Sequence, residues 1–533
     1  MLTISIIFVL LSNAFTSRRD LSLYFNRSLI IVLLITLLLA INSNNFIVLK
    51  EGISILGGLF HNSNLTITFH VFILFISLVI LQLTAFLPKK YINNNMNPNN
   101  RFMENLLSNL QYFDKNKEQY SIIEYPLVIV FIILGAIFII SSSDIISVFI
   151  SIELQSYGLY LLCSLYRNSE LSTGAGLTYF LLGGLSSCFI LLASGILYAN
   201  SGTTNLEGYY ILANLSNVNQ SLYNIIYWYD NNYINYSLVI LSLGFLFKIS
   251  AAPFHFWSPD VYDAIPTVVT TFVANVAKIS LLIFLIDIVH HSSNLEIFNF
   301  NWTYCLLISS FLSLIIGTVL GLNQSRVKRL LAYSTISHIG FILLGISINS
   351  IESMQAFIFY LMQYSISNIN IFMILVSIGY TIYIPEKQEK TLSEQDNSPV
   401  QYIAQLRGYF YVNPVLAISL AIVMYSFVGV PPLIGFFGKQ MILSSALDKG
   451  YVFISLIAIL TSVISAVYYL NIIKEIFFEK PEDQLSKNKD YTVTLSTSIS
   501  VFVSIFTLII LLFIFSPQQW LSITNILAIY IFT

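Results

Sequence analysis

Long apolar runs, separated by short polar segments, follow one another along the whole chain of 533 residues. A helix that crosses a bilayer needs about 20 mostly apolar residues. Because the runs are continuously apolar and do not alternate, the strands of a membrane barrel do not fit them. The pattern therefore predicts an all-α integral membrane protein of about fourteen transmembrane helices. They are expected at 2–16, 28–43, 66–88, 122–141, 145–166, 172–199, 237–256, 265–289, 303–322, 328–349, 352–384, 411–446, 451–478 and 492–515.

The basic residues support this number of helices. Of the 24 lysines and arginines, 19 fall in odd-numbered loops and only two, Lys50 and Lys449, fall in even-numbered loops. Lysine and arginine gather in the loops on one side of a membrane protein, and a wrong helix count would mix the two sets of loops. The distribution also predicts that both termini lie on the side opposite the basic loops.

The composition excludes several classes of function. Asp, Glu, Lys and Arg make up 9% of the chain and the formal net charge is −2, whereas a soluble domain carries about 25% charged residues and a nucleic-acid-binding protein needs a basic surface. The sequence contains no phosphate-binding loop, dinucleotide fingerprint, HExxH motif or cysteine cluster. We therefore expect no cofactor or metal in this chain and no nucleic-acid partner.

Three lysines and one glutamate fall well inside predicted spans: Glu153, Lys248, Lys278 and Lys439. Asp144, Asp287 and Glu352 lie near the ends of predicted spans, where contact with water is cheap. Ionisable residues in a membrane segment are costly and are functional candidates by default. Static ion pairs cannot explain the set, because one carboxylate cannot pair three lysines. Removal from water favours the uncharged form of a lysine, so an unpaired buried lysine can take up and release a proton. This pattern favours proton handling over static pairing.

Prolines accompany two of these lysines. Pro253 follows Lys248, and Pro431 and Pro432 precede Lys439. Proline interrupts a helix, and broken backbone at membrane depth is tolerated only inside protein or beside a water cavity. The two sites are five helices apart, which is typical of an inverted repeat. We expect an N-terminal part at 1–121, repeats at 122–289 and 303–478, and a C-terminal helix with a surface segment at 490–533.

One histidine also lies inside a predicted span. His338 has Ser334, Thr335 and Ser337 close by in the sequence, and histidine titrates near physiological pH. A lone histidine on an apolar helix is often a packing residue. The polar neighbours, and a place between the two interrupted helices, make His338 a possible proton relay.

At this point the chain resembles the complex I and cation/proton antiporter superfamily, and within it the subunit 2 family of mitochondrial NADH dehydrogenase, especially the fungal forms. The resemblance is carried by DIISVFISIELQSYGLYLL, TYFLLGGLSSCF, LGFLFKISAAPFHFWSPDVYDAIPT, VKRLLAYSTISHIGF and SFVGVPPLIGFFGK. It implies an antiporter-like fold with discontinuous helices 7 and 12. It also implies proton translocation coupled to electron transfer from NADH to ubiquinone, which makes the chain part of an enzyme without a redox site of its own.

The resemblance also implies roles for the buried charges. Glu153 would modulate Lys248, Lys278 would be the central lysine, and Lys439 would be the last lysine of the row. Relatives often carry a lysine in helix 6 where this chain has Thr178. A hydroxyl can hydrogen-bond to water but cannot store a charge, so the unit would rely on fewer charges or on a direct link from Lys248 to Lys278.

The expected setting follows from the same resemblance. The chain would lie in the mitochondrial inner membrane, in contact with lipids, with its basic loops in the matrix and both termini in the intermembrane space. Subunit 4 and the small subunits 4L, 6 and 3 would be its neighbours. NADH, FMN, iron–sulfur clusters and ubiquinone would be bound by other subunits.

Two other functions remain open from the sequence. One is a free-standing or Mrp-like cation/proton antiporter, which uses the same buried charges in a transporter. The other is a passive scaffold in which the charges only hold helices together.

Overall fold

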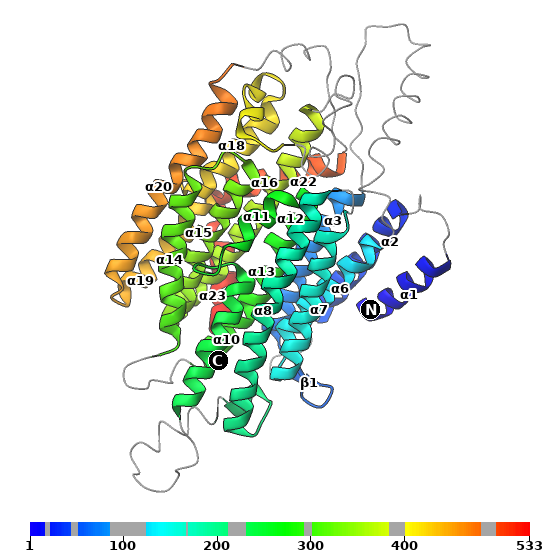
Figure 1. Cartoon of the computed structure of the whole chain (residues 1–533). Coiled ribbons are helices and arrows are strands. Elements are labelled where there is room, and N and C mark those ends of the chain that lie inside the picture. The colour runs from blue at the N-terminus through cyan, green and yellow to red at the C-terminus, as the bar shows by residue number, and fades with distance from the viewer. Residues whose placement is uncertain are drawn as a thin grey trace.

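The computed structural model describes residues 1–15, 22–43, 52–85, 124–166, 169–209, 211, 231–292, 301–382, 400–480 and 497–532. Within these ranges the chain is a bundle of long helices (Figure 1). A short antiparallel hairpin joins strands β1 (Ile53–Ile55) and β2 (Phe60–Asn62). The prediction of an all-α membrane protein is confirmed apart from this small hairpin.

The helices of the first half of the chain are α1 (Leu2–Phe15), α2 (Ser22–Ser43), α3 (Asn64–Ala85), α6 (Tyr125–Ser141), α7 (Ile145–Ser164), α8 (Glu170–Ser201), α10 (Asn231–Ile249), α11 (Trp257–Ala264), α12 (Thr267–Ala274) and α13 (Val276–Ser292). Those of the second half are α14 (Thr303–Gly321), α15 (Val327–Ile348), α16 (Ile351–Ile382), α18 (Pro414–Val428), α19 (Ile434–Asp448), α20 (Val452–Phe477), α22 (Thr497–Leu512) and α23 (Pro517–Phe532). Short 3-10 turns occupy Ile403–Leu406, Tyr409–Tyr411 and Phe513–Phe515.

Ten helices in the described part of the chain are long and apolar enough to cross a membrane. Each lies within or over one of the fourteen predicted spans. The other four predicted spans hold shorter apolar helices, at Leu2–Ser12, Tyr125–Ser141, Ile234–Ile249 and Pro414–Val428. The positions of the apolar segments therefore agree with the prediction, while the number fourteen stays a prediction.

The two interruptions predicted from proline are present. One separates α10 from α11 around Pro253, and the other separates α18 from α19 around Pro431 and Pro432. Proline has no backbone N–H to donate and its ring clashes with the preceding turn. At each interruption one residue takes a left-handed backbone conformation, Ser250 with φ +66° and Gly429 with φ +88°. Helices 7 and 12 of the predicted set are therefore discontinuous.

A third interruption was not predicted. The expected helix at 265–289 is divided at Asn275, between α12 and α13. The Asn275 side chain donates to the carbonyl of Thr271, and its own side-chain oxygen accepts from Asn368 on α16. Asparagine side chains compete with the backbone for hydrogen bonds, and this competition lies three residues before Lys278.

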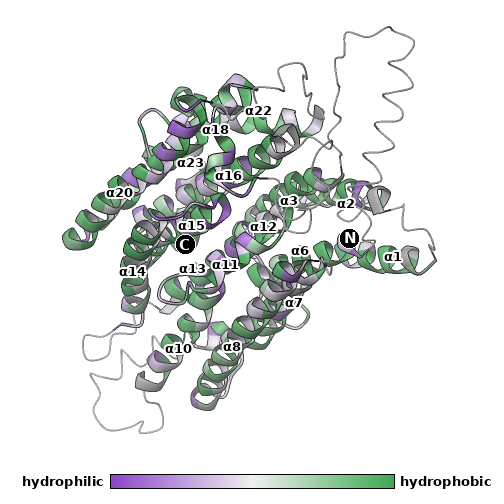
Figure 2. Ribbon diagram, turned by 45° about the horizontal axis from the view of Figure 1, so that its top comes forward, coloured by the Kyte–Doolittle hydropathy of each residue, from purple (hydrophilic) through white to green (hydrophobic). Residues whose placement is uncertain are grey.

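The helix α15 forms the centre of the bundle, and every residue of its membrane-spanning window is buried. Most of the α12–α13 and α16 windows are also buried, whereas α8, α14 and α20 keep much of their surface outside. Hydrophobic residues dominate these outer helices, and hydrophilic residues gather near α11 and α15 (Figure 2). Gly317 of α14 and Gly340 of α15 leave no room for a side chain between the two helices, which is how small residues bring membrane helices together.

Candidate functional site

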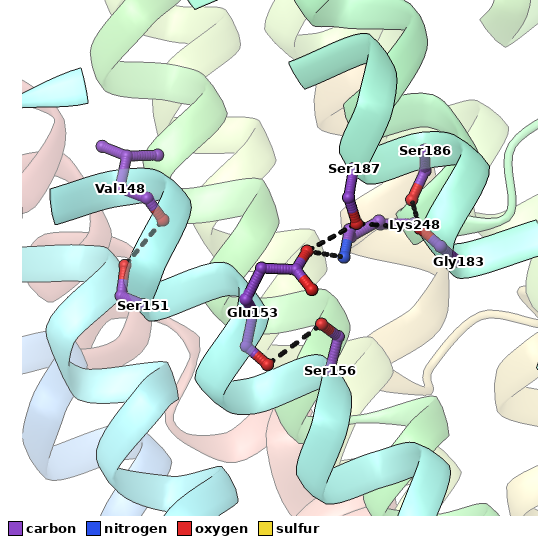
Figure 3. A network of polar contacts seen from close by, with 8 residues as sticks. All are labelled: Val148, Ser151, Glu153, Ser156, Gly183, Ser186, Ser187 and Lys248. Atoms are coloured by element: carbon purple, nitrogen blue, oxygen red, sulfur yellow. Dashed lines mark hydrogen bonds and ion pairs between the residues drawn. The ribbon is translucent and has the colours of Figure 1, made fainter. Parts of the chain in front are cut away.

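Glu153 and Lys248 form an ion pair inside the bundle. Glu153 lies on α7 and Lys248 in the last turn of α10, with 3.2 Å between Lys248 Nζ and Glu153 Oε1. Ser187 of α8 donates its hydroxyl to the same carboxylate oxygen at 2.5 Å (Figure 3). The two charged side chains are 13% and 7% exposed. Side chains from three helices thus meet at one carboxylate. Glu153 and Lys248, which we expected to be coupled, are in direct contact.

A small cavity and a hydrogen bond lie between this ion pair and the next lysine. The cavity is lined by Lys248, Gln155 and Ala277 among others, and its volume of about 20 Å³ gives room for about one water molecule. Gln155 of α7 accepts a hydrogen bond from Ser280 of α13 at 3.1 Å. Ser280 is two residues beyond Lys278, so α7 reaches from the ion pair to the helix of the central lysine.

Lys278 is buried at the start of α13. Its Nζ lies 3.4 Å from the Thr335 hydroxyl of α15 and 5.3 Å from the centre of the Tyr262 ring. The residue is 3% exposed, and the described residues place no carboxylate oxygen within 4.0 Å of its nitrogen. A hydroxyl and an aromatic face solvate a cation weakly compared with water, so Lys278 can exist with or without its proton.

His338 lies one turn beyond Thr335 on α15. Its Nδ1 lies 2.7 Å from the Tyr360 hydroxyl of α16, and its Nε2 lies 3.1 Å from the Tyr469 hydroxyl of α20. Both ring nitrogens therefore have a partner that can donate or accept. A packing histidine and a proton relay would both make these contacts. The geometry is therefore compatible with either role for His338.

Lys439 lies in the second turn of α19 and points back to the end of α18. Its Nζ donates to the carbonyl oxygens of Phe427 and Val428, at 2.8 Å each. These carbonyls belong to the last turn of α18, where helix carbonyls lack intrahelical partners. The nitrogen also lies 5.6 Å from the centre of the Phe341 ring. Within the described residues no carboxylate pairs with Lys439.

The five predicted residues therefore form one row through the bundle. Ser280 and Gln155 link the region of Lys248 to α13, Thr335 links Lys278 to α15, and the Phe427 ring lies 5.0 Å from the His338 ring. Phe427 also supplies a carbonyl to Lys439. Only the first lysine of the row has an acidic partner in the described part of the chain, as the charge count predicted.

Sequence reasoning missed the hydroxyl and amide groups that connect the row. Ser187, Gln155, Tyr360 and Tyr469 were not singled out, because the chain has 33 tyrosines and many serines and no spacing marks the few that matter. Thr178 lies on the exposed face of α8, and its hydroxyl bonds to Ala175 of its own helix. No hydrogen bond joins Thr178 to Lys248, whose amine bonds to Glu153.

Lys328 is a correction to the loop count. The positive-inside argument counted it with the basic loops, but it is 2% exposed and its Nζ donates to the carbonyl of Ile265 at 2.5 Å. Beside it, Arg326 pairs with Asp263 at 2.6 Å, and this carboxylate raises the pKa of Arg326. The start of α15 is thus fastened to the end of α11 by basic groups, and one of them is fully buried.

The described residues contain no group of three or more His, Cys, Asp or Glu side chains that could hold a metal ion. The functional groups of this site are therefore amines, one carboxylate, one imidazole and hydroxyls, which are groups that exchange protons.

Comparison with known proteins shows the family of the chain. The family model described as NADH:quinone oxidoreductase/Mrp antiporter, TM, matches residues 142–465. The chain is 42% identical to NADH-ubiquinone oxidoreductase chain 2 of Rhizopus oryzae, over the full length of both. Its fold is similar to a chain of respiratory complex I from Thermus thermophilus, with TM-score 0.71 and 21% identity over 98% and 97% of the two chains. It is also similar to a chain of the Mrp complex from Dietzia, with TM-score 0.75 and 16% identity over 100% and 96%.

The two solved structures share the fold at low identity and so do not separate a respiratory subunit from an antiporter. The relative from Rhizopus oryzae separates the two, because its sequence matches over the whole length of both chains. The chain belongs to the NADH:quinone oxidoreductase/Mrp antiporter family and, within it, to the family of chain 2 of NADH-ubiquinone oxidoreductase.

Proposed function

We propose that this chain translocates protons in the membrane arm of NADH-ubiquinone oxidoreductase, complex I, while the complex transfers electrons from NADH to ubiquinone. The observation that carries the proposal is that two buried lysines well inside the predicted spans, Lys278 and Lys439, have no carboxylate partner among the described residues. Lys328, which also has none, lies at the very start of its span and donates to a backbone carbonyl. A permanent unpaired charge at the position of Lys278 or Lys439 is expensive. Groups that alternate between charged and neutral forms are what a proton path needs.

In this proposal the Glu153–Lys248 pair controls the row. A change of charge beside Glu153, which keeps 13% of its side chain exposed, would weaken or strengthen its hold on Lys248. The altered charge on Lys248 would favour or oppose a proton on Lys278, since electrostatic interactions are strong in a low-dielectric interior. Protons would then shift along Lys278, His338 and Lys439.

The second candidate is a free-standing or Mrp-like cation/proton antiporter. The likeness to a chain of the Mrp complex supports the shared fold only, because identity is 16%. Purification separates the two: the respiratory subunit co-isolates with an NADH-oxidising complex, whereas an antiporter exchanges sodium for protons on its own.

The setting that we propose follows the family. The chain is a multi-pass protein of the mitochondrial inner membrane, and we propose that its basic loops face the matrix and both termini face the intermembrane space. Its neighbours would be subunit 4 and the small subunits 4L, 6 and 3, and the other subunits would bind NADH, FMN, iron–sulfur clusters and ubiquinone. We also propose the division into repeats at 122–289 and 303–478, because an interruption follows the fourth helix of each repeat, α10 in the first and α18 in the second.

Replacement of Lys439 by alanine tests the function. The variant, assembled into the complex and reconstituted into vesicles, should oxidise NADH but transfer fewer protons per electron, as should Lys278→Ala. The control is Lys449→Ala, which removes an exposed lysine beyond the end of α19 and should leave the ratio unchanged. A normal ratio in both buried-lysine variants would contradict the proposal and would support the scaffold, which predicts loss of assembly only.

A further inference from the structure

A polar face runs along α16, which is one of the most buried helices of the described part of the chain. Gln363, Ser367 and Asn370 follow one another at spacings of four and three residues, so they lie on one side of the helix. They are 2%, 0% and 0% exposed. The helix packs against α15, α18, α19, α22 and α23, and also against α12 of the first half. The three side chains therefore lie inside the bundle.

The polar atoms of this face lack partners. Gln363 Oε1, Ser367 Oγ and both Oδ1 and Nδ2 of Asn370 have no hydrogen-bond partner among the described residues. The hydroxyl of Ser426 on α18, which is 0% exposed, is also unpartnered. Most serines in this bundle bond to a carbonyl of their own helix. Ser365, two residues from Ser367, does so with Met362 at 2.8 Å.

This face begins beside Lys439. Gly438 precedes Lys439 on α19, and a methyl group added to Gly438 would lie 2.7 Å from Gln363 Oε1. Ser426 precedes Phe427, whose carbonyl accepts from Lys439 Nζ. Lys439 uses two hydrogen bonds on these carbonyls, whereas an ammonium group can donate three. The unpartnered oxygens of Gln363 and Ser426 thus lie in the same region as the Lys439 ammonium, which has one N–H left to donate.

Buried polar groups in native proteins are paired with protein or with ordered water, and buried water bridges otherwise unsatisfied groups in polar sites. We propose that Gln363, Ser367 and Asn370 of α16, with Ser426 of α18, bind a file of water molecules that carries protons between Lys439 and the basic-loop end of α16. This inference rests on the proposed function. It adds the route by which Lys439 reaches one side of the membrane.

The geometry gives the file a direction and a length. From Gln363 to Asn370 the helix advances seven residues, about 10 Å at 1.5 Å per residue, toward its end at Ile382. Ser377 lies further along the same side of the helix, but its hydroxyl bonds to the carbonyl of Met373 at 2.8 Å, so the unpartnered groups end at Asn370. Each step moves one proton along a hydrogen bond. The Lys439 ammonium becomes an amine as the adjacent water becomes hydronium, which passes its extra proton to the next water, and the reverse sequence reloads the lysine.

Apolar replacements of similar shape test the proposal in the assembled complex in vesicles. Gln363→Met and Asn370→Leu should lower the protons transferred per electron to the level of Lys439→Ala, with NADH oxidation retained. Asn370→Ser keeps a polar group that can bind water and should retain most of the transport. Ser367→Ala should lower the ratio, whereas Ser365→Ala, the same change two residues away at a bonded hydroxyl, should not.

The outcomes separate this inference from the function on which it rests. If Lys439→Ala lowers the number of protons transferred per electron while Gln363→Met and Asn370→Leu leave it unchanged, the proposed file of water molecules is wrong. The proposed function is then still supported. If Lys439→Ala itself has no effect, the proposed function fails first. Should the leucine variant not assemble, a density map of the unaltered complex decides: waters bonded to Asn370 and Gln363 support the file, and a dry face overturns it.

Discussion

At the scale of single residues, the site depends on how each ionisable group is solvated. Glu153 accepts two hydrogen bonds on one oxygen, from Lys248 and from Ser187. Lys439 is solvated by two backbone carbonyls, and Lys278 has only a hydroxyl and an aromatic face. Charge is thus best stabilised at Glu153–Lys248 and least at Lys278. This gradient suits a row in which the middle lysine changes its state most readily.

The Glu153 carboxylate is open to a direct test at this scale. Glu153→Gln leaves the Lys248 ammonium buried without an acidic partner, which costs about 3–5 kcal/mol for a buried pair. Ser187→Ala removes a hydroxyl donor to the charged carboxylate and should cost about 1.5–3 kcal/mol. We therefore expect a larger loss of thermal stability and of NADH:ubiquinone activity in Glu153→Gln, measured on the purified complex. Equal losses in the two variants would show that the charge of Glu153 has no special role.

At the scale of elements, each lysine of the row lies beside a point where a helix is interrupted. Lys248 ends the first part of one interrupted helix, Lys278 begins α13 just after Asn275, and Lys439 lies in the second part of another. The end of a helix leaves carbonyls unpaired and carries a partial negative charge. A lysine at such an end is therefore stabilised without an acidic residue. Lys439 donates to two such carbonyls, whereas Lys248 pairs with Glu153.

Gly429 tests the interruption between α18 and α19. Its φ of +88° suits glycine, and an added methyl group would lie 3.2 Å from the side chain of Lys439. Gly450 has φ +83° but nothing within 4 Å of the same position. Alanine costs about 1–2 kcal/mol at either site because of the backbone conformation. Only Gly429→Ala should also lower the protons transferred per electron, since it displaces Lys439. If Gly429→Ala and Gly450→Ala transfer the same number of protons per electron, the close approach of Gly429 to Lys439 has no role in transport.

At the scale of the whole molecule, distant parts of the chain supply the row. The groups come from α7, α10, α13, α15 and α19, with α16 and α20 adding the tyrosines that hold His338 (Figure 1). The helix α15 lies at the centre because every residue of its spanning window is covered by other helices. The row thus passes through the part of the bundle that is most remote from lipid.

The proposed orientation in the membrane can be tested with the two ends of α20. This helix has 26 residues, about 39 Å at 1.5 Å per residue, which is enough to cross the bilayer. Lys449 precedes it and Phe478, 81% exposed, follows it. In a background with Cys188 replaced by serine, a membrane-impermeant thiol reagent should label Phe478→Cys from the matrix side and Lys449→Cys from the intermembrane-space side. Labelling of both from one side would contradict the topology.

The sequence by itself determined the class of the protein, the position of its apolar segments, two of its three interruptions and the few charges inside the membrane. These follow from local properties, because hydropathy and proline act on the residues around them. Only the tertiary structure decided that Glu153 meets Lys248, that Tyr360 and Tyr469 hold His338, that Lys328 is buried and that α16 carries an unpartnered polar face. Such facts depend on how each helix is rotated against its neighbours, and that rotation is set by packing between segments as much as 131 residues apart in the sequence.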